Sequence, residues 1–143
     1  MTDQGGLFIE DLEEGMSASF SKTITEADIL MFAGVSGDTN PVHLDAEFAA
    51  GTMFKERIAH GMLSASLIST VLGTKLPGPG AIYMSQTLKF KAPVKIGDTV
   101  TATGTISELN HDKRRATIAC VCTVQGKPVV EGEAMVMVPS RKS

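Results

Sequence analysis

Hydrophobic and polar positions alternate in the first part of the chain and then change to helical spacing. Residues 16–24 alternate with a period of two, which predicts a strand. Residues 26–35 carry apolar side chains at helical spacing, and Thr25 is a suitable N-cap for that helix. Asp45 is placed in the same way to cap a short helix over residues 46–50. This part therefore predicts one strand followed by short helices.

Residues 62–72 contain no charged side chain and place small residues between large ones. A helix without a polar face has to be buried on all sides, so we expect this segment at the centre of the fold. Gly73 is a suitable C-cap, and Pro77 and Pro79 prevent the helix from continuing. The segment is shorter than the roughly 18 apolar residues that a membrane span needs.

The chain after residue 81 predicts strands separated by polar turns. The apolar pattern marks four of them, at residues 82–90, 100–106, 116–124 and 130–138. The turn between the last two, residues 125–127, has the composition of a hairpin. One curved antiparallel sheet of about five strands, wrapped around one apolar helix, would bury both, and this α+β arrangement is the hot-dog fold. An α+β sandwich of another topology stays open on the pattern alone.

Composition indicates one compact domain. The chain has 143 residues, of which 43% are hydrophobic, and no inter-domain linker, so we treat residues 1–143 as one domain and expect residues 1–7 to be flexible. A formal charge of -3 without a basic stripe argues against nucleic-acid binding. Residues 1–10 lack the basic and apolar regions of a signal peptide, and no run is a membrane span, so we expect a cytoplasmic protein.

The two cysteines agree with a reducing compartment. Cys120 and Cys122 are two residues apart in a segment that predicts a strand, so they share one face. A disulfide between them would be strained. We therefore expect two free, buried thiols.

Residues 36–43 combine a carboxylate, an imidazole and an Asn-Pro step. Pro41 fixes its own φ and disfavours the α region for Asn40, so the chain has to turn sharply between Asp38 and His43. In such a turn the two side chains can approach the same water molecule. Asp and Asn are also common turn residues that bond to nearby backbone, and His43 alone could be an ordinary hydrogen-bonded histidine. The residues alone leave both interpretations open.

Gly61 follows His60 at the expected start of the apolar helix. The first N–H groups of a helix have no intrahelical partners and lie at the positive end of the helix dipole. Because glycine lets a ligand approach the backbone closely, the Gly61 N–H could donate to a carbonyl oxygen. Gly61 could equally serve only to allow a tight turn into the helix.

These motifs together resemble a known family. Residues 32–43, which end in Asp-x-Asn-Pro-x-His and are followed by Phe48 and two alanines, are similar to the signature of MaoC-like hydratases. Residues 60–66 resemble the start of that family's central helix, and residues 82–98 resemble its following strand and turn. The resemblance covers nearly the whole chain and is strongest with the short (R)-specific enoyl-CoA hydratases, which have a single hot-dog domain.

The resemblance implies a reaction and the residues that carry it out. Asp38 and His43 would be the catalytic pair, with Asn40 in a supporting position between them. The Gly61 N–H would bind the carbonyl oxygen of the thioester. The pair would add water to a trans-2-enoyl-CoA from one face and form the (R)-3-hydroxyacyl-CoA, which would link fatty-acid β-oxidation to polyhydroxyalkanoate synthesis.

The resemblance also implies a supporting serine and an assembly. Ser66 would hold Asp38, although Ser64 is equally near and a hydroxyl in a buried helix can bond back to a carbonyl. A homodimer is implied, with the acyl tunnel near the subunit boundary, and pairing would also protect an open sheet edge. The reaction needs no cofactor. We expect no metal site, because metal-ligand spacing is lacking around His43, His60 and His111.

Three other functions stay open at this point. A hot-dog acyl-CoA thioesterase would cleave the thioester, although the Asp-x-Asn-Pro-x-His turn favours a hydratase. In a non-catalytic subunit that binds acyl thioesters, Asp38 and His43 would be turn residues only. A 3-hydroxyacyl-carrier-protein dehydratase would run the same chemistry in reverse on a protein-bound acyl chain.

Overall fold

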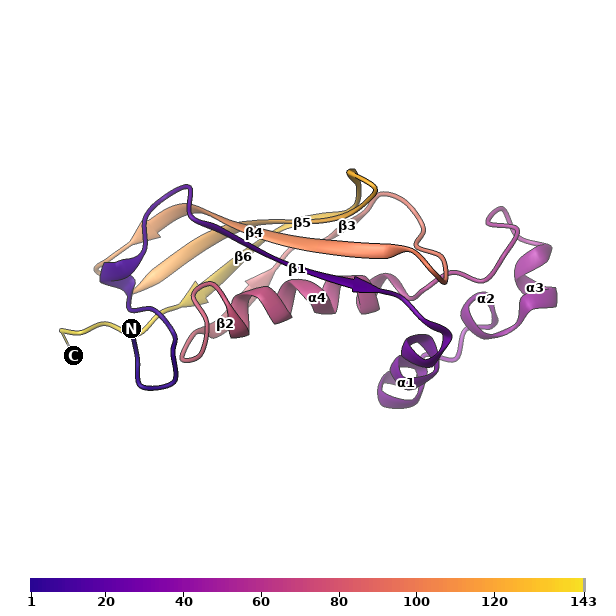
Figure 1. The fold of residues 1–143 in the computed structure, drawn as a ribbon, viewed down its shortest axis with the longest axis horizontal. Helices are drawn as coiled ribbons and strands as arrows, with labels where there is room; N and C mark the ends of the chain where they lie inside the picture. The colour runs from indigo at the N-terminus through magenta and orange to yellow at the C-terminus, as the bar shows by residue number, and fades with distance from the viewer. Residues whose placement is uncertain (143) are drawn as a thin grey trace.

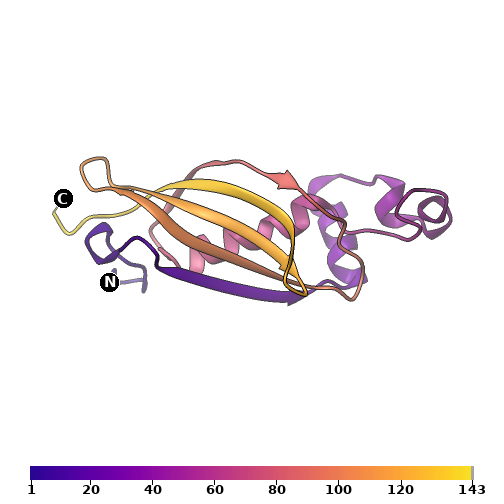
Figure 2. The same cartoon turned by 90° about the horizontal axis from the view of Figure 1, so that it is seen from above.

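One antiparallel sheet lies over a single long helix (Figure 1; Figure 2 shows the sheet from above). The computed structural model describes residues 1–142. Six strands form the sheet in the order β1-β4-β5-β6-β2, and β3 also pairs with β6. Their bounds are Ser17–Thr23 (β1), Ile82–Gln86 (β2), Lys89–Phe90 (β3), Thr99–Asn110 (β4), Arg115–Val124 (β5) and Lys127–Met137 (β6). The hot-dog fold is confirmed, with six strands where about five are expected.

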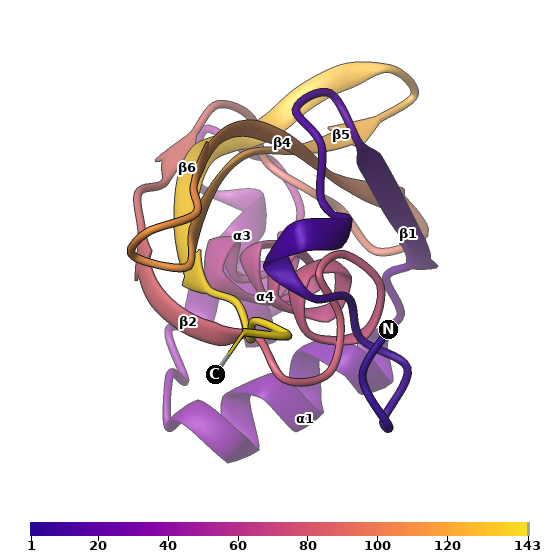
Figure 3. The same cartoon turned by 90° about the vertical axis from the view of Figure 1, so that its left-hand side faces the viewer.

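Helix α4, Gly61–Thr74, lies along the inner face of this sheet. Seen end-on, the sheet curves over the helix from β1 on one side to β2 on the other (Figure 3). The side of α4 that faces the strands is buried and consists of Ser64, Ala65, Leu67, Ile68, Val71 and Leu72. These side chains meet inward-pointing residues such as Ala102, Ile118 and Val130 in one continuous core. Burial of this apolar surface is the main stabilising contribution of the fold.

The expectation that α4 is buried on all sides is wrong for the single chain. Met62 is 54% exposed, and Ser66 and Ser69 are exposed along the same side of the helix. The sheet curves around one side of α4 only, so no strand within residues 1–142 covers the other side. The helix also continues through Gly73 to Thr74 and has Lys75 as its C-cap. A single glycine costs a helix only about 1 kcal/mol, which the packing of the last turn offsets.

The single strand expected over residues 82–90 is divided into β2 and β3. Between them, the Thr87 N–H donates to the Glu133 carbonyl oxygen at 2.9 Å. The Glu133 N–H in turn donates to the Thr87 hydroxyl at 3.0 Å. Thr87 therefore uses its side chain in place of a backbone ladder bond, and the chain bends there before it pairs with β6 again.

Short helices connect β1 to α4 and extend beyond the end of the sheet (Figure 1). They are α1 (Glu26–Ser36), α2 (Pro41–Leu44) and α3 (Ala46–Ala50). Thr25 and Asp45 cap α1 and α3 through their side-chain oxygens, as predicted. The pattern does not predict α2, which begins because Pro41 at the first helical position follows the Asn40 cap. No helix in residues 1–142 is long and apolar enough to cross a membrane.

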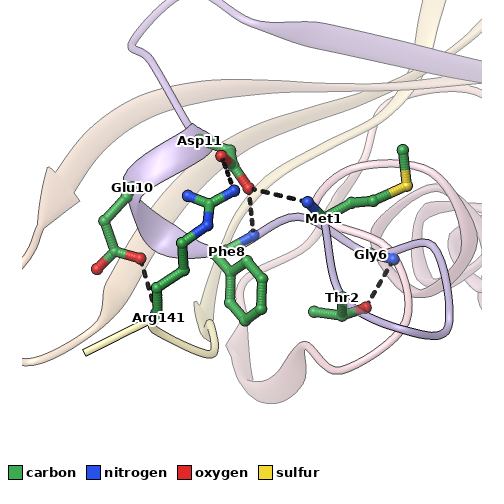
Figure 4. Close-up of polar contacts among 7 residues, drawn as sticks. All are labelled: Met1, Thr2, Gly6, Phe8, Glu10, Asp11 and Arg141. Atoms are coloured by element: carbon green, nitrogen blue, oxygen red, sulfur yellow. Dashed lines mark hydrogen bonds and ion pairs between the residues drawn. The ribbon is translucent and has the colours of Figure 1, made fainter. Parts of the chain in front are cut away.

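The two ends of the described chain are joined by polar contacts (Figure 4). The Arg141 guanidinium donates to Asp11 Oδ1 at 2.6 Å and lies 4.7 Å from the centre of the Phe8 ring. The Arg141 N–H donates to the Glu10 carboxylate at 2.9 Å. Hydrogen bonds from the Phe8 N–H and from Arg141 lower the pKa of the Asp11 carboxyl. These contacts tie the short 3-10 helix Ile9–Asp11 to the segment after β6, while the flexibility expected for residues 1–7 stays a prediction.

Both cysteines are free and buried on β5, as expected. Burial raises the pKa of Cys122 to about 12 and also raises the pKa of Cys120. Because the thiolate is the reactive form, both thiols are poor nucleophiles at neutral pH. They act as small core side chains between the sheet and α4.

Replacing Ile118 with alanine is expected to lower the free energy of unfolding by about 2–5 kcal/mol, the usual cost of truncating a buried isoleucine. Ile118 is fully buried where β5 approaches Val71 and Leu72 of α4. Urea unfolding followed by circular dichroism measures the loss. The neighbouring Thr117→Ala variant, on the outer face of the same strand, is the control and should change the free energy of unfolding by less than about 1 kcal/mol. Equal losses in both variants would contradict this location of the core.

Candidate active site

The loop between α1 and α2 presents Asp38. Helix α1 ends at Gly37, whose φ of 77° lies in the left-handed region that glycine adopts readily. Asp38 Oδ1 accepts a hydrogen bond from the Asn40 N–H at 3.2 Å, and Asn40 Oδ1 accepts one from the Val42 N–H at 3.1 Å. The carboxylate stays exposed, while Asn40 shapes the turn that leads into α2.

The chain turns at Asn40, which lies outside the α region as expected, and His43 then lies buried on the one-turn helix α2. Its Nδ1 is 2.8 Å from the carbonyl oxygen of Ile58. A carbonyl oxygen can only accept, so Nδ1 carries the proton of the neutral ring. Nε2 is then the nitrogen with a free lone pair, and it can accept a proton from a bound water.

His60 joins the parts of this site, and the sequence interpretation misses it. Its ring is 2% exposed and stacks on His43, with 3.9 Å between ring centres and an interplanar angle of 27°. Its Nε2 is 2.9 Å from the backbone carbonyl oxygen of Asp38. Phe32 of α1 also packs against the His60 ring, with 4.8 Å between the ring centres. A histidine just before the first residue of the central helix is the only signal in the sequence, and it does not indicate these contacts.

Gly61 is the first residue of α4, as expected from the sequence. An added Cβ atom at this position would lie 2.6 Å from the Phe90 ring, so a larger residue here would have to displace the exposed Phe90 side chain. Its N–H belongs to the first turn, where backbone donors have no intrahelical partner. This donor lies at the positive end of the α4 dipole and can bind a carbonyl oxygen.

A cavity of about 500 Å³ brings these groups together. Asp38, His43, His60 and Gly61 all line it. One carboxylate oxygen of Asp38 and one ring nitrogen of each histidine lie within 4.8 Å of one another. A single water with hydrogen bonds of about 2.8 Å can join two atoms up to about 5.6 Å apart. Asp38 and His43 can therefore hold one water between them.

The structure does not bring Ser66 to Asp38. The Ser66 hydroxyl is exposed and donates to the Leu63 carbonyl oxygen of the preceding turn at 2.6 Å. Ser64, the alternative that the sequence leaves open, lines the cavity together with Asp38. The two serines are about 200° apart around the helix, so only one of them can face the cavity.

The cluster of Asp38, His43 and His60 could be considered as a metal site. A zinc ion binds such ligands at about 2.0–2.2 Å, which requires ligand atoms within about 4.4 Å of one another. The three ligand atoms here spread over as much as 4.8 Å. The geometry therefore fits a water held for proton transfer better than it fits a metal ion.

Comparison with known proteins identifies the family. Residues 9–128 match the MaoC like domain. This chain belongs to the MaoC-like domain family. Over 134 residues, which are 94% of this chain and 93% of the relative, the MaoC-like chain is 63% identical to the (R)-specific enoyl-CoA hydratase of Rhodospirillum rubrum. It is 52% identical to the 3-hydroxybutyryl-CoA dehydratase of Methylorubrum extorquens, over 95% of this chain and 87% of that protein.

Solved structures of two (R)-hydratases are similar to the structure of this MaoC-like chain. The unliganded R-hydratase PhaJ1 from Pseudomonas aeruginosa superposes with a TM-score of 0.90 at 50% identity, covering 95% of this chain and 88% of that one. The (R)-hydratase from Aeromonas caviae superposes with a TM-score of 0.88 at 47% identity, covering 91% of this chain and 99% of that one. These superpositions confirm the architecture over nearly the full length of the described residues.

Proposed function

We propose that this MaoC-like chain is an (R)-specific enoyl-CoA hydratase, a hydro-lyase that reversibly adds water to a trans-2-enoyl-CoA to form the (R)-3-hydroxyacyl-CoA. The observation that carries the proposal is the joint position of Asp38, His43 and Gly61 around one cavity. A base for water and a donor for a thioester oxygen are the two groups that hydration requires. The names of the relatives in Rhodospirillum and Aeromonas support the same reaction.

The Asp38–His43 pair would move the proton. Water held between the carboxylate and His43 Nε2 gives one proton to the pair as its oxygen bonds to the β-carbon. The pair then returns that proton to the α-carbon, so that one water is added across the double bond. Both additions come from the side on which the pair lies, which makes the addition syn. General acid–base catalysis of this kind contributes typically about 10²–10⁴ in rate.

Gly61 would stabilise the enolate oxygen. As the hydroxide adds to the β-carbon, negative charge develops on the thioester oxygen, and a backbone N–H at the start of α4 can bind it. Loss of one such donor costs about 10²–10³ in rate in other enzymes. The donor comes from the backbone and is already oriented by the helix, so it needs no rearrangement during the reaction.

The proposed product, an (R)-3-hydroxyacyl-CoA, indicates the metabolic role of the reaction. The (R)-hydratase of Aeromonas caviae is involved in polyhydroxyalkanoate (PHA) biosynthesis. An (R)-3-hydroxyacyl-CoA made by this chain would supply the same kind of polymer from intermediates of β-oxidation. The cytoplasmic location expected from the sequence belongs to this proposal.

We further propose that two copies form a homodimer. Strand β2 lies at the edge of the sheet, and its Ile82, Tyr83 and Met84 are large and exposed. A second hollow of about 510 Å³ lies between this strand and the uncovered side of α4. Pairing of two β2 edges would cover both, and it would remove an open strand edge. Symmetric pairing of this kind is the usual form of a homodimer.

Asp38→Asn and His43→Ala are each expected to lower kcat/KM for hydration at least about 100-fold, because each removes part of the proton transfer. Circular dichroism should stay unchanged, since Asp38 lies in an exposed loop and His43 on a one-turn helix. Asp112→Asn and His111→Ala, in the exposed turn between β4 and β5, are matched controls that should keep full activity. A loss of less than tenfold would remove the tested residue from the mechanism.

The reaction itself can be tested with crotonyl-CoA by following two signals together. Hydration predicts a loss of the ultraviolet absorbance of the conjugated thioester without release of free thiol. The product should be oxidised by an (R)-specific but not by an (S)-specific 3-hydroxyacyl-CoA dehydrogenase, because the water attacks from one face. Thiol release in step with the absorbance would indicate a thioesterase. A fast reaction only with the carrier-protein ester would indicate the dehydratase, and binding without either signal would indicate a non-catalytic subunit.

The homodimer predicts a sedimentation-equilibrium mass of about twice the 15.1 kDa chain at micromolar concentration. Replacing Met84 on the exposed edge strand with lysine should weaken the dimer, since a charge would be placed in an apolar contact. Met53→Lys, at a more exposed methionine away from β2, is the control and should leave the mass unchanged. A stable monomer of the unmodified protein would contradict the proposal.

A further inference from the structure

Arg57 is a largely buried arginine that contacts the backbone of His43. Its side chain is 15% exposed, and its Nε–H donates to the His43 carbonyl oxygen at 2.7 Å. A second nitrogen of the same guanidinium donates to the Glu26 carboxylate at 2.6 Å. The described residues that line the cavity of Asp38 and His43 do not include Arg57. An effect of Arg57 on the reaction would therefore be transmitted through His43.

The His43 carbonyl oxygen needs a donor from outside its own helix. The last four carbonyl oxygens of a helix have no intrahelical partner, and α2 consists of four residues in all. A single turn also forms too few hydrogen bonds to offset the cost of helix nucleation. The position of α2, and with it that of His43, therefore depends on contacts with other segments of the chain.

The residue after Arg57 supplies further contacts to α2. The Ile58 N–H donates to the Val42 carbonyl oxygen at 3.3 Å, and the Ile58 carbonyl oxygen lies 2.8 Å from His43 Nδ1. Ile58 also forms an antiparallel bridge with Lys95, which fixes this segment. Residues 57 and 58 thus provide partners for two carbonyl oxygens of α2 and for the imidazole ring of His43.

Glu26 orients the guanidinium of Arg57. It is the first residue of α1, and its side chain is 58% exposed, so the ion pair by itself contributes little to stability. A guanidinium is planar and carries its N–H groups in fixed directions, so the bond to Glu26 also directs the Nε–H. A lysine has one donor nitrogen and cannot serve both acceptors with this geometry.

We propose that Arg57 is a positioning residue that, together with Glu26, holds His43 in the direction that proton transfer requires. The inference rests on the proposed hydratase function. The bond from Arg57 keeps the backbone of His43 in place beside Ile58, and the bond from Nδ1 to Ile58 leaves Nε2 free for the water. Without Arg57, α2 can shift and Nε2 moves away from the distance that a general base needs.

The first test measures kcat and KM for hydration of crotonyl-CoA in Arg57→Gln. The kcat should fall about 10- to 100-fold, since a misplacement of about 1 Å has costs of this size. KM should stay unchanged, because Arg57 does not line the cavity. Arg57→Lys should recover only part of kcat, because it keeps the charge but not the fork of donors. Glu26→Gln should lower kcat less and should add no loss to Arg57→Gln, since Glu26 acts only through Arg57.

Arg141→Gln is the matched control for these variants. Arg141 forms an ion pair with Asp11 at the same distance of 2.6 Å. It lies near the chain ends, at the end of the molecule away from α1 and α2 (Figure 1). Its loss should leave kcat and KM unchanged, although it also removes an arginine and one ion pair.

The second test observes His43 without any substrate. NMR spectroscopy of isotope-labelled histidine distinguishes the two neutral forms of the imidazole. His43 should be protonated at Nδ1 in the unmodified protein and in Arg141→Gln, and it should become a mixture of both forms in Arg57→Gln. Guanidinium ion added to Arg57→Ala should restore part of kcat, whereas ammonium ion should not, because only the planar ion reproduces the paired donors.

The outcomes distinguish this inference from the proposed function. An unmodified protein that does not hydrate crotonyl-CoA overturns the proposed function, and the NMR comparison still decides whether Arg57 holds His43. An active protein in which Arg57→Gln changes neither kcat nor the form of His43 overturns the positioning role alone. A rise in KM at unchanged kcat would assign Arg57 to substrate binding and would also contradict it. If Arg57→Gln loses its native circular dichroism spectrum, Arg57→Lys decides by the same two measurements.

Discussion

The apolar side of α4 packs along the concave face of the sheet, and the position of the cavity follows from that contact. Because Leu67, Ile68 and Val71 are buried under β4, β5 and β6, the first turn of the helix is held at one end of the sheet. The Gly61 N–H therefore has a fixed direction, and His60 lies directly before it. The position of the proposed catalytic groups therefore depends on the packing of α4 against the sheet.

Backbone carbonyl oxygens determine which ring nitrogen carries the proton in each of the two stacked histidines. His43 donates through Nδ1 to Ile58, and His60 donates through Nε2 to Asp38. Each bond leaves the opposite nitrogen as an acceptor, and that of His60 is buried and unpaired. The same kind of hydrogen bond thus leaves His43 with a nitrogen that can act as the proposed base and leaves His60 with a buried acceptor.

The chain buries its core on one side of α4 and leaves apolar surface on the other. Exposed Met62, Tyr83 and Met84 lie around one hollow next to an open strand edge. A contiguous apolar surface with free backbone groups favours association. Met62 lines both this hollow and the cavity that contains Asp38 and His43, so the proposed homodimer would place the second copy beside that cavity.

The local pattern of the sequence was enough to predict the strands, the capped helices, the central helix and the Asp38–His43 motif. These follow from side-chain periodicity, capping and the Asn-Pro step, which act over a few residues. The pattern did not indicate that His60 stacks on His43, that the strand over residues 82–90 bends at Thr87, or that Ser64 and not Ser66 faces the cavity. Such contacts depend on how the sheet curves around α4, because residues far apart in the chain meet only after the helix is packed against it.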